Sequence, residues 1–232
     1  MRSVLVTGSN RGLGFEWVRQ YAQDDWRVYA TCRRPEEAEA LQALADVHPG
    51  LSVHRLDVTE PQQIRDLAQE LSNQPLDLLV NNAGVYFERW GRDRLGQIDY
   101  DDWLATLSVN TLGAFRVTEA LLGSLEKGEK PLVVNISSHM GSIAEITAPN
   151  DYAYRSSKAA LNAASHGLAL ELQNYGISLL ILHPGWVRTR MGGEDAPVTP
   201  EESVAGMRAM VNRFTPADNG RFYRYDGVEL PW

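Results

Sequence analysis

Cysteine is nearly absent from this sequence. Cys32 is the only one among 232 residues, so no disulfide can form within the chain. Disulfides are common in oxidising compartments and rare inside cells, which favours an intracellular setting. The apolar run Ser3–Thr7 follows the first two residues directly and is typical of a buried strand rather than of a removable signal peptide. We therefore expect a cytoplasmic protein.

Basic charge and long apolar runs are also scarce. The chain has 22 Lys and Arg residues against 30 Asp and Glu residues, a net charge of -8, with the two signs interspersed. Nucleic acids and anionic membrane surfaces attract basic proteins, so neither is expected as the main partner. A membrane-spanning helix needs about 20 consecutive apolar residues, and no segment approaches that length. We expect a small-molecule substrate, no membrane span and no metal site.

Apolar runs and amphipathic stretches alternate along nearly the whole chain, and 44% of the residues are apolar. The runs predict strands at Ser3–Thr7, Arg27–Cys32, Ser52–Leu56, Leu76–Val80, Leu132–Ile136, Ile177–His183 and Arg221–Tyr225. The amphipathic stretches predict helices at Phe15–Gln23, Pro35–Ala45, Pro61–Ser72, Tyr100–Leu125, Tyr152–Tyr175 and Pro200–Arg213. This alternation predicts one α/β domain over residues 1–232, a doubly wound and mostly parallel sheet with helices on both faces.

Tyr154 and Lys158, in the stretch YRSSK, lie one helical turn apart on the same face of a predicted helix. A free tyrosine titrates near pH ~10 and a lysine near ~10.4, so neither alone is an acid–base catalyst near neutrality. A fixed neighbouring cation favours phenolate and is expected to lower the pKa of the tyrosine. The spacing alone also fits an ordinary surface pair, so the rest of the sequence has to separate the two interpretations.

The start of the chain favours the catalytic interpretation. A glycine-rich loop lies between the predicted strand Ser3–Thr7 and a helix pattern. Gly8 permits a tight turn, Gly12 lets the backbone approach a pyrophosphate, and Gly14 allows close helix–strand packing. The free N–H groups and the dipole of the following helix would hold the phosphates, although the loop alone could be a plain structural turn. The predicted cofactor-binding residues of the loop are Gly8, Ser9, Asn10, Arg11, Gly12, Leu13 and Gly14.

Four further signals lie after predicted strands or within the central helix. They are Asn81–Gly84, Asn110, Ser137-Ser138 and His183–Thr189. Each has an ordinary explanation by itself, such as a turn, a bent helix or an N-cap, because Asn is unfavourable inside a helix and Ser favours caps. Their order and spacing beside the glycine loop and the Tyr–Lys pair argue against coincidence.

In this combination the chain resembles the short-chain dehydrogenase/reductase family, a Rossmann-fold family, over essentially its whole length. The motifs that carry the resemblance are TGSNRGLG, Asp57-Val58, NNAG, Asn110, the serine pair, YRSSK and PGWVRT. Within the family the chain looks most similar to the C-factor-like and sniffer-type carbonyl reductases. The segments behind that narrower likeness are Tyr152–Arg155, Ala159–Asn162, His183–Val187, Met191–Gly193 and Tyr225–Gly227.

The resemblance implies a catalytic tetrad of Asn110, Ser138, Tyr154 and Lys158. Tyr154 would exchange a proton with the substrate oxygen, and Ser138 would hydrogen-bond that oxygen. Lys158 would lower the pKa of the tyrosine and bind the nicotinamide ribose, and Asn110 would distort its helix and hold a water of a proton relay. The further cofactor contacts that the resemblance implies are Asp57, Val58, Asn82, Ala83, Gly84, Asn110, Tyr154, Lys158, Pro184, Gly185, Trp186, Val187 and Thr189.

One departure from the family concerns the spacing of the tetrad. Ser138 and Tyr154 lie 16 positions apart, more than is commonest in the family. We place the extra residues within Ala144–Asp151, an acidic loop that contains a proline and is expected over the active site. Ser137 remains a less favoured alternative to Ser138.

The end of the second predicted strand bears on the choice of cofactor. NAD sites usually have an acidic residue there, bonded to the ribose 2′-hydroxyl. Here the strand ends in Thr31-Cys32-Arg33-Arg34, and Arg11 lies in the glycine loop. A guanidinium matches a phosphate, so Arg11 and Arg33 predict a clamp on the 2′-phosphate and favour NADP(H) over NAD(H). The alternative is that both are solvated surface charges.

These observations predict an NADP(H)-dependent carbonyl reductase or alcohol dehydrogenase. The alternative is a dinucleotide-binding signalling protein of the C-factor type with little or no turnover, against which the complete tetrad argues. A sugar-nucleotide epimerase or dehydratase would need a larger C-terminal substrate region. Six residues expected to rim the pocket favour a hydrophobic or aromatic ketone, aldehyde or quinone: Tyr86, Trp90, Met140, Ile146, Trp186 and Met191.

The predicted helix Tyr152–Tyr175 carries many small residues and bears on assembly. Small side chains let helices approach closely, either onto the sheet or against a second copy. From this we predict a homo-oligomer, a dimer or a tetramer.

Overall fold

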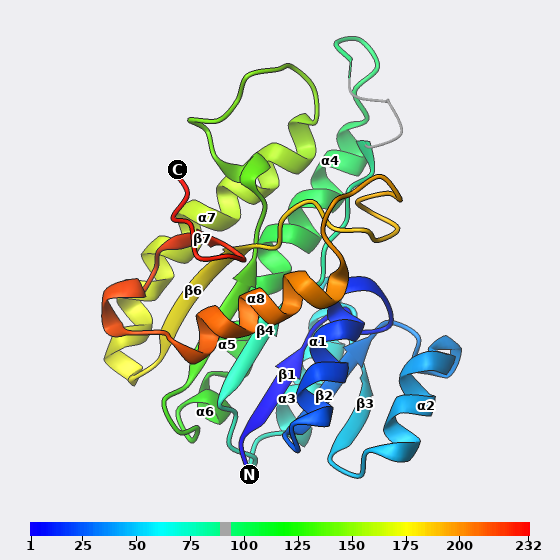
Figure 1. Ribbon diagram of the computed structural model, residues 1–232, viewed down its shortest axis with the longest axis vertical. Helices are drawn as coiled ribbons and strands as arrows, with labels where there is room; N and C mark the ends of the chain where they lie inside the picture. Colours follow the sequence, from blue (N-terminus) through cyan, green and yellow to red (C-terminus); the bar gives the residue numbers. More distant parts are fainter. Residues whose placement is uncertain (89–93) are drawn as a thin grey trace.

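The computed structural model describes residues 1–88 and 94–232 and contains one parallel sheet (Figure 1). Within these ranges the sheet has seven strands in the order β3-β2-β1-β4-β5-β6-β7. The strands are β1 Ser3–Val6, β2 Arg27–Cys32, β3 Leu51–Arg55, β4 Leu78–Asn81, β5 Leu132–Ile136, β6 Ser178–His183 and β7 Phe222–Arg224. The strand order reverses between β1 and β4, and in such sheets ligands bind outside the carboxyl ends at this point. The predicted doubly wound parallel sheet is confirmed.

Helices connect the strands. The α-helices are α1 Gly12–Gln23, α2 Glu39–Val47, α3 Pro61–Glu70, α4 Tyr100–Leu107, α5 Gly113–Ala120, α6 Leu122–Leu125, α7 Tyr152–Leu172 and α8 Pro200–Asn212. Short 3₁₀ turns lie at η1 Pro35–Glu37, η4 His139–Gly141, η5 Gln173–Tyr175 and η6 Pro216–Asp218, and a π-helical turn, η3, at Ser108–Leu112. No helix in the described part of the chain is both long and apolar enough to cross a membrane.

Three helix predictions need correction. The first helix begins at Gly12 rather than at Phe15, so the last glycines of the loop already belong to α1. The predicted helix Pro35–Ala45 is broken at Ala38, whose backbone leaves the helical region between η1 and α2. The predicted helix Tyr100–Leu125 is divided into α4, η3, α5 and α6. In each case the apolar periodicity located the helix but not its bounds.

Two hydrophobic cores lie on opposite faces of the sheet, because alternate residues of each strand point to opposite sides. Val4 and Val6 of β1 belong to one core, and Leu5 between them belongs to the other. The first core takes from the helices Trp17, Val18 and Tyr21 of α1, Leu41 of α2 and Val204, Met207 and Met210 of α8. The second takes Ile64 and Leu67 of α3, Val117 of α5 and Ala169 and Leu172 of α7. Each fully buried Leu, Val or Ile contributes about 1.5–3 kcal/mol relative to leaving it exposed.

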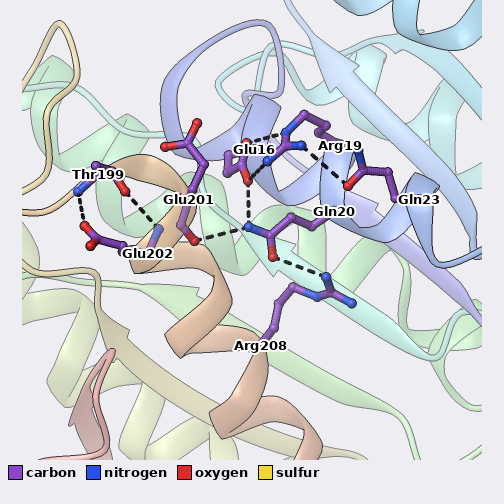
Figure 2. A network of polar contacts seen from close by, with 8 residues as sticks. All are labelled: Glu16, Arg19, Gln20, Gln23, Thr199, Glu201, Glu202 and Arg208. Atoms are coloured by element: carbon purple, nitrogen blue, oxygen red, sulfur yellow. Dashed lines mark hydrogen bonds and ion pairs between the residues drawn. The ribbon is translucent and has the colours of Figure 1, made fainter.

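A polar network joins α1 to α8 (Figure 2). Glu16 is 3% exposed and accepts hydrogen bonds from Arg19 (2.6 and 2.7 Å) and from the Gln20 amide (2.6 Å). The same Gln20 amide donates to the carbonyl oxygen of Glu201 (3.2 Å), and Arg208 donates to the Gln20 side-chain oxygen (3.2 Å). Because α1 begins at the glycine loop and α8 follows the segment after β6, the network fixes these two parts of the candidate site against each other.

Candidate active site

The glycine loop closes against the segment that follows β4. Gly8 has a φ of +70°, and a Cβ there would lie 3.0 Å from the Ala83 Cα. A Cβ on Gly14 would overlap the Gly8 carbonyl oxygen and lie 2.6 Å from the Asn82 amide nitrogen. That nitrogen donates to the carbonyl oxygens of Thr7 (2.9 Å) and Gly8 (3.2 Å). The space admits backbone only, so the loop presents the first N–H groups of α1 at the switch point of the sheet.

Thr7 is a structural residue of this loop that the sequence analysis did not single out. Its hydroxyl accepts hydrogen bonds from the backbone N–H groups of Asn82 (3.0 Å) and Ala83 (2.9 Å). The sequence could have indicated this role, because Thr7 is the first residue of the TGSNRGLG motif. Of the predicted loop residues, Ser9 is buried, Asn10 is exposed and Leu13 packs against the first core.

Three arginines gather at the edge of the loop. Burial lowers the pKa of Arg11, and the charges of Arg190 and Arg33 lower that pKa further. Gly12 has a φ of +55°, and a Cβ there would lie 3.5 Å from the Thr189 side chain, so the segment after β6 reaches the loop. Like charges repel, and an anion among them would relieve that repulsion. Arg190 was missed by the sequence analysis, although it directly follows the PGWVRT segment.

The rest of the segment after β6 is held by its own contacts. Gly185 has a φ of +85°, and a Cβ there would lie 2.9 Å from the Tyr225 ring. Trp186 is 55% exposed, and its indole N–H donates to the Gly192 carbonyl oxygen (2.8 Å). Val187 is buried. The predicted residues Pro184, Gly185, Trp186, Val187 and Thr189 therefore lie on one ordered segment beside the glycine loop.

Asp57 and Val58 follow β3 at the same edge of the sheet. The Asp57 carboxylate accepts hydrogen bonds from the backbone N–H (2.9 Å) and the hydroxyl (2.7 Å) of Thr59. Val58 is buried and packs where Gly113 of α5 has no side chain, because a Cβ there would lie 2.7 Å from the Val58 side chain. The positions of Asp57 and Val58 are thus fixed by contacts within the protein.

Asn110 lies in the π-helical turn η3 and is 2% exposed. Its side-chain oxygen accepts from the Val85 N–H (2.8 Å), and its amide donates to the Val85 carbonyl (2.9 Å) and to the Ser157 hydroxyl (3.0 Å). A Cβ on Gly84 would lie 3.4 Å from the Asn110 oxygen and 3.8 Å from the Lys158 amine. The distortion predicted at Asn110 is present, and π-turns of this kind often mark functional sites.

The two serines after β5 have different partners, because successive residues of an extended chain point in opposite directions. The Ser137 hydroxyl is buried and donates to the Asn162 side-chain oxygen (2.6 Å). The Ser138 hydroxyl lies on the side of the Tyr154 phenol, whose pKa it lowers, and it accepts from the Met140 N–H (3.2 Å). Of the two, Ser138 is the serine that faces Tyr154.

Tyr154 and Lys158 lie on α7 as predicted, but their electrostatics differ from the expectation. Burial raises the pKa of Tyr154 to about 12, and the hydrogen bond from Ser138 lowers it only in part. Burial also lowers the pKa of Lys158 to about 8. The Lys158 amine lies 5.8 Å from the centre of the Tyr154 ring and donates to the Ile136 carbonyl (2.9 Å). The expected lowering of the tyrosine pKa is therefore reversed, because desolvation outweighs the distant cation.

The substrate side is formed by irregular segments. The Tyr86 ring packs on the Tyr154 ring with centroids 4.4 Å apart and planes inclined by 31°. Ile146 and Met191 are 49% and 37% exposed. Trp90, also predicted to rim the pocket, lies outside the described residues. Among the predicted pocket residues in the described part of the chain, Tyr86 contacts Tyr154 through its ring, and Met140 contacts Ser138 through its backbone N–H.

Comparisons with known proteins agree with this geometry. Residues 2–198 match the model of the short chain dehydrogenase family. The C-signal of Myxococcus xanthus is 43% identical over 169 residues, which are 73% of this chain and 100% of that protein.

Solved structures also show similarity to carbonyl reductases. Carbonyl reductase Sniffer of D. melanogaster superposes with a TM-score of 0.92 at 32% identity over 100% of both chains. An NADPH-bound carbonyl reductase from chicken fatty liver superposes with a TM-score of 0.91 at 34% identity over 100% of this chain and 99% of that one. The predicted likeness to C-factor-like and sniffer-type proteins is confirmed. The chain belongs to the short-chain dehydrogenase family.

Proposed function

We propose that this protein is an NADP(H)-dependent oxidoreductase that reduces a carbonyl group to an alcohol. The observation that carries the proposal is the buried Tyr154 phenol, whose pKa the Ser138 hydroxyl lowers, with Lys158 one turn further along the same helix. A burial-raised pKa of about 12 keeps that phenol protonated at neutral pH. A protonated phenol can donate to a carbonyl oxygen, as reduction requires.

The chemistry of the donors fits a dinucleotide phosphate. The N–H groups at the start of α1 and the cluster of Arg11, Arg33 and Arg190 would hold the phosphates, with Arg11 and Arg33 on the 2′-phosphate. Asp57 and Val58 would contact the adenine, and the segments 82–84 and 184–189 the nicotinamide half. NADP(H), when bound, supplies the hydride. The NADPH in the chicken carbonyl reductase supports this choice over NAD(H).

The protein's own residues would then handle the proton. Tyr154 donates its phenolic proton to the substrate oxygen, and the Ser138 hydroxyl donates a hydrogen bond to the same oxygen as charge develops on it. Lys158 is suited to return a proton to the tyrosine, because burial lowers its pKa to about 8. Asn110 holds Val85 and Ser157 on either side of this path.

The second candidate is a signalling role without turnover, which the 43% identity to C-signal keeps open. A panel of hydrophobic and aromatic ketones, aldehydes and quinones, assayed by loss of NADPH absorbance, tests the proposal. We expect turnover on several of them, faster with NADPH than with NADH. NADPH binding without turnover on any class would favour the signalling role.

We further propose a cytoplasmic homo-oligomer. Leu104 of α4 and Leu170 of α7 are 66% and 62% exposed, and the small residues Ala163 and Gly167 of α7 are exposed as well. A second copy packed on this face would cover them. Sedimentation at low micromolar concentration tests the idea, and a single species near 25.9 kDa would contradict it.

A further inference from the structure

The first turn of α7 is capped by a residue from a distant loop. Asp151 precedes the helix with a φ of 57° and makes no side-chain cap. Instead, the backbone N–H groups of Ala153 and Tyr154 donate to the two carboxylate oxygens of Glu88, each over 2.7 Å. Glu88 lies 65 and 66 positions earlier in the chain, in the segment that follows β4. One carboxylate thus occupies two of the donors that a helix start leaves without partners inside the helix.

A second residue of the same segment contacts the same turn. The Tyr86 hydroxyl donates to the Asp151 carboxylate, while the Tyr86 ring packs on the Tyr154 ring. Tyr86 and Glu88 are separated by one position, so one short segment contacts the first turn of α7 through two side chains. Tyr154 itself is contacted twice: Glu88 accepts from its backbone N–H, and Tyr86 packs on its ring.

The local chain does not by itself favour this entry into the helix. Asn150 and Asp151 both have positive φ values, 79° and 57°. The left-handed region is uncommon for residues other than glycine, and such conformations persist where the surroundings impose them. The bonds from Glu88 and Tyr86 provide those surroundings, and a carboxylate beside the positive end of a helix is favourable.

We propose that Glu88 is a positioning residue for Tyr154: its carboxylate fixes the first turn of α7 so that the phenol meets Ser138 and the substrate oxygen. The inference rests on the proposed function, since it needs Tyr154 to be the proton donor. Glu88 bonds the backbone of Tyr154 itself, so a shift of the carboxylate moves the catalytic side chain directly. A displacement of about 1 Å at a reacting group can cost about a hundredfold in rate.

Kinetics of Glu88→Ala and Glu88→Gln test the inference. We expect Glu88→Ala to lower kcat about ten- to a hundredfold, with the NADPH Kd unchanged. Glu88→Gln keeps one acceptor oxygen, so an intermediate loss is expected, and it serves as the test if Glu88→Ala does not fold. The matched control is Asp99→Ala, because Asp99 caps α4 by accepting from the N–H groups of Asp101 and Asp102 (3.0 Å each). The control should lose stability and keep kcat.

A second readout does not depend on turnover. Carbon-13 NMR of labelled tyrosine rings can follow the titration of Tyr154, whose signal is assigned by its loss in Tyr154→Phe. Burial raises the pKa of this phenol to about 12, so a loosened turn that admits water should lower the pKa toward its ordinary value near 10. If the wild type proves inactive on every carbonyl, the proposed function fails while this titration still tests the positioning. Wild-type kcat together with an unchanged Tyr154 pKa in Glu88→Ala would overturn the inference.

Discussion

The two sides of the candidate site are built in different ways. On the proposed cofactor side, Gly8 and Gly14 allow close backbone contacts, and their partners, such as Asn82, follow strand ends that the parallel sheet brings to one edge. On the catalytic side, Glu88 and Tyr86 hold a helix start some 65 positions away, after two residues in left-handed conformations. The difference indicates that the proposed cofactor side is built from motifs at strand ends, whereas the placement of Tyr154 depends on contacts between irregular segments.

The largest effect is expected from Tyr154→Phe, which alters the catalytic side alone. The change removes the phenolic proton and little volume, and general acid catalysis contributes about 10²–10⁴-fold. We expect kcat to fall by that factor with the NADPH Kd unchanged, measured by steady-state kinetics and by fluorescence titration. A variant that keeps more than about a tenth of the rate would contradict the assigned role, and a loss of NADPH binding would show that the two sides are not separable.

Lys158→Met alters the residue that belongs to both sides. Burial lowers the pKa of Lys158 from 10.5 to about 8. Between pH 8 and pH 10.5 the Lys158 amine therefore carries a proton in the unfolded state and not in the folded state. The stability of the wild type should therefore rise as the pH increases from 8 to 10.5, and below pH 8 the buried ammonium destabilises the fold. We expect the inactive variant to be more stable at pH 7 by about 3–4 kcal/mol, since each pKa unit corresponds to about 1.4 kcal/mol.

Denaturant unfolding of both proteins from neutral to alkaline pH measures this difference. The advantage of Lys158→Met should shrink above pH 8, as the wild-type amine loses its proton. A variant that is less stable than the wild type at neutral pH would mean that the bond from Lys158 to the Ile136 carbonyl outweighs the burial of the charge.

Arg11→Ala and Arg33→Ala alter the cofactor side alone, and the expected effect is smaller. A charge-assisted contact to phosphate is worth about 1.5–3 kcal/mol, roughly ten- to a hundredfold in affinity. NADPH binding should weaken by that factor while NADH binding changes little, and kcat at saturating NADPH should be unchanged. Arg34→Ala is a suitable control, because Arg34 is exposed and paired with Glu37. Equal losses for both cofactors would rule out the clamp.

Much of the fold and part of the site could be predicted from the sequence. The strands follow from short apolar runs, and the glycine loop follows from Gly8, Gly12 and Gly14, since no other residue fits so close a backbone approach. The sequence also predicted a helix distortion at Asn110 and favoured Ser138 over Ser137 as the serine near Tyr154. These features depend on local sequence or on strand ends, which a parallel sheet brings to one edge whatever the loops do.

Other features could not be predicted, because they depend on contacts between distant segments. The pKa of Tyr154 was expected to fall, but the depth of burial in the folded protein raises it. Arg190 lies near Arg11 because the neighbouring Thr189 packs against Gly12, at the far end of the chain from the loop. The break at Ala38 and the limits of the π-turn likewise have no signal in the apolar periodicity.

The sequence by itself determined the parallel α/β sheet and the glycine loop, and it supplied the residues of the proposed tetrad. Hydrophobic periodicity and the backbone freedom of glycine act over a few residues, so they can be recognised along the chain. The tertiary structure alone decided that Glu88 caps the helix of Tyr154, that Tyr86 covers its ring and that burial sets the protonation of Tyr154 and Lys158. Desolvation and long-range hydrogen bonds exist only once the segments have been brought together, and no residue carries them alone.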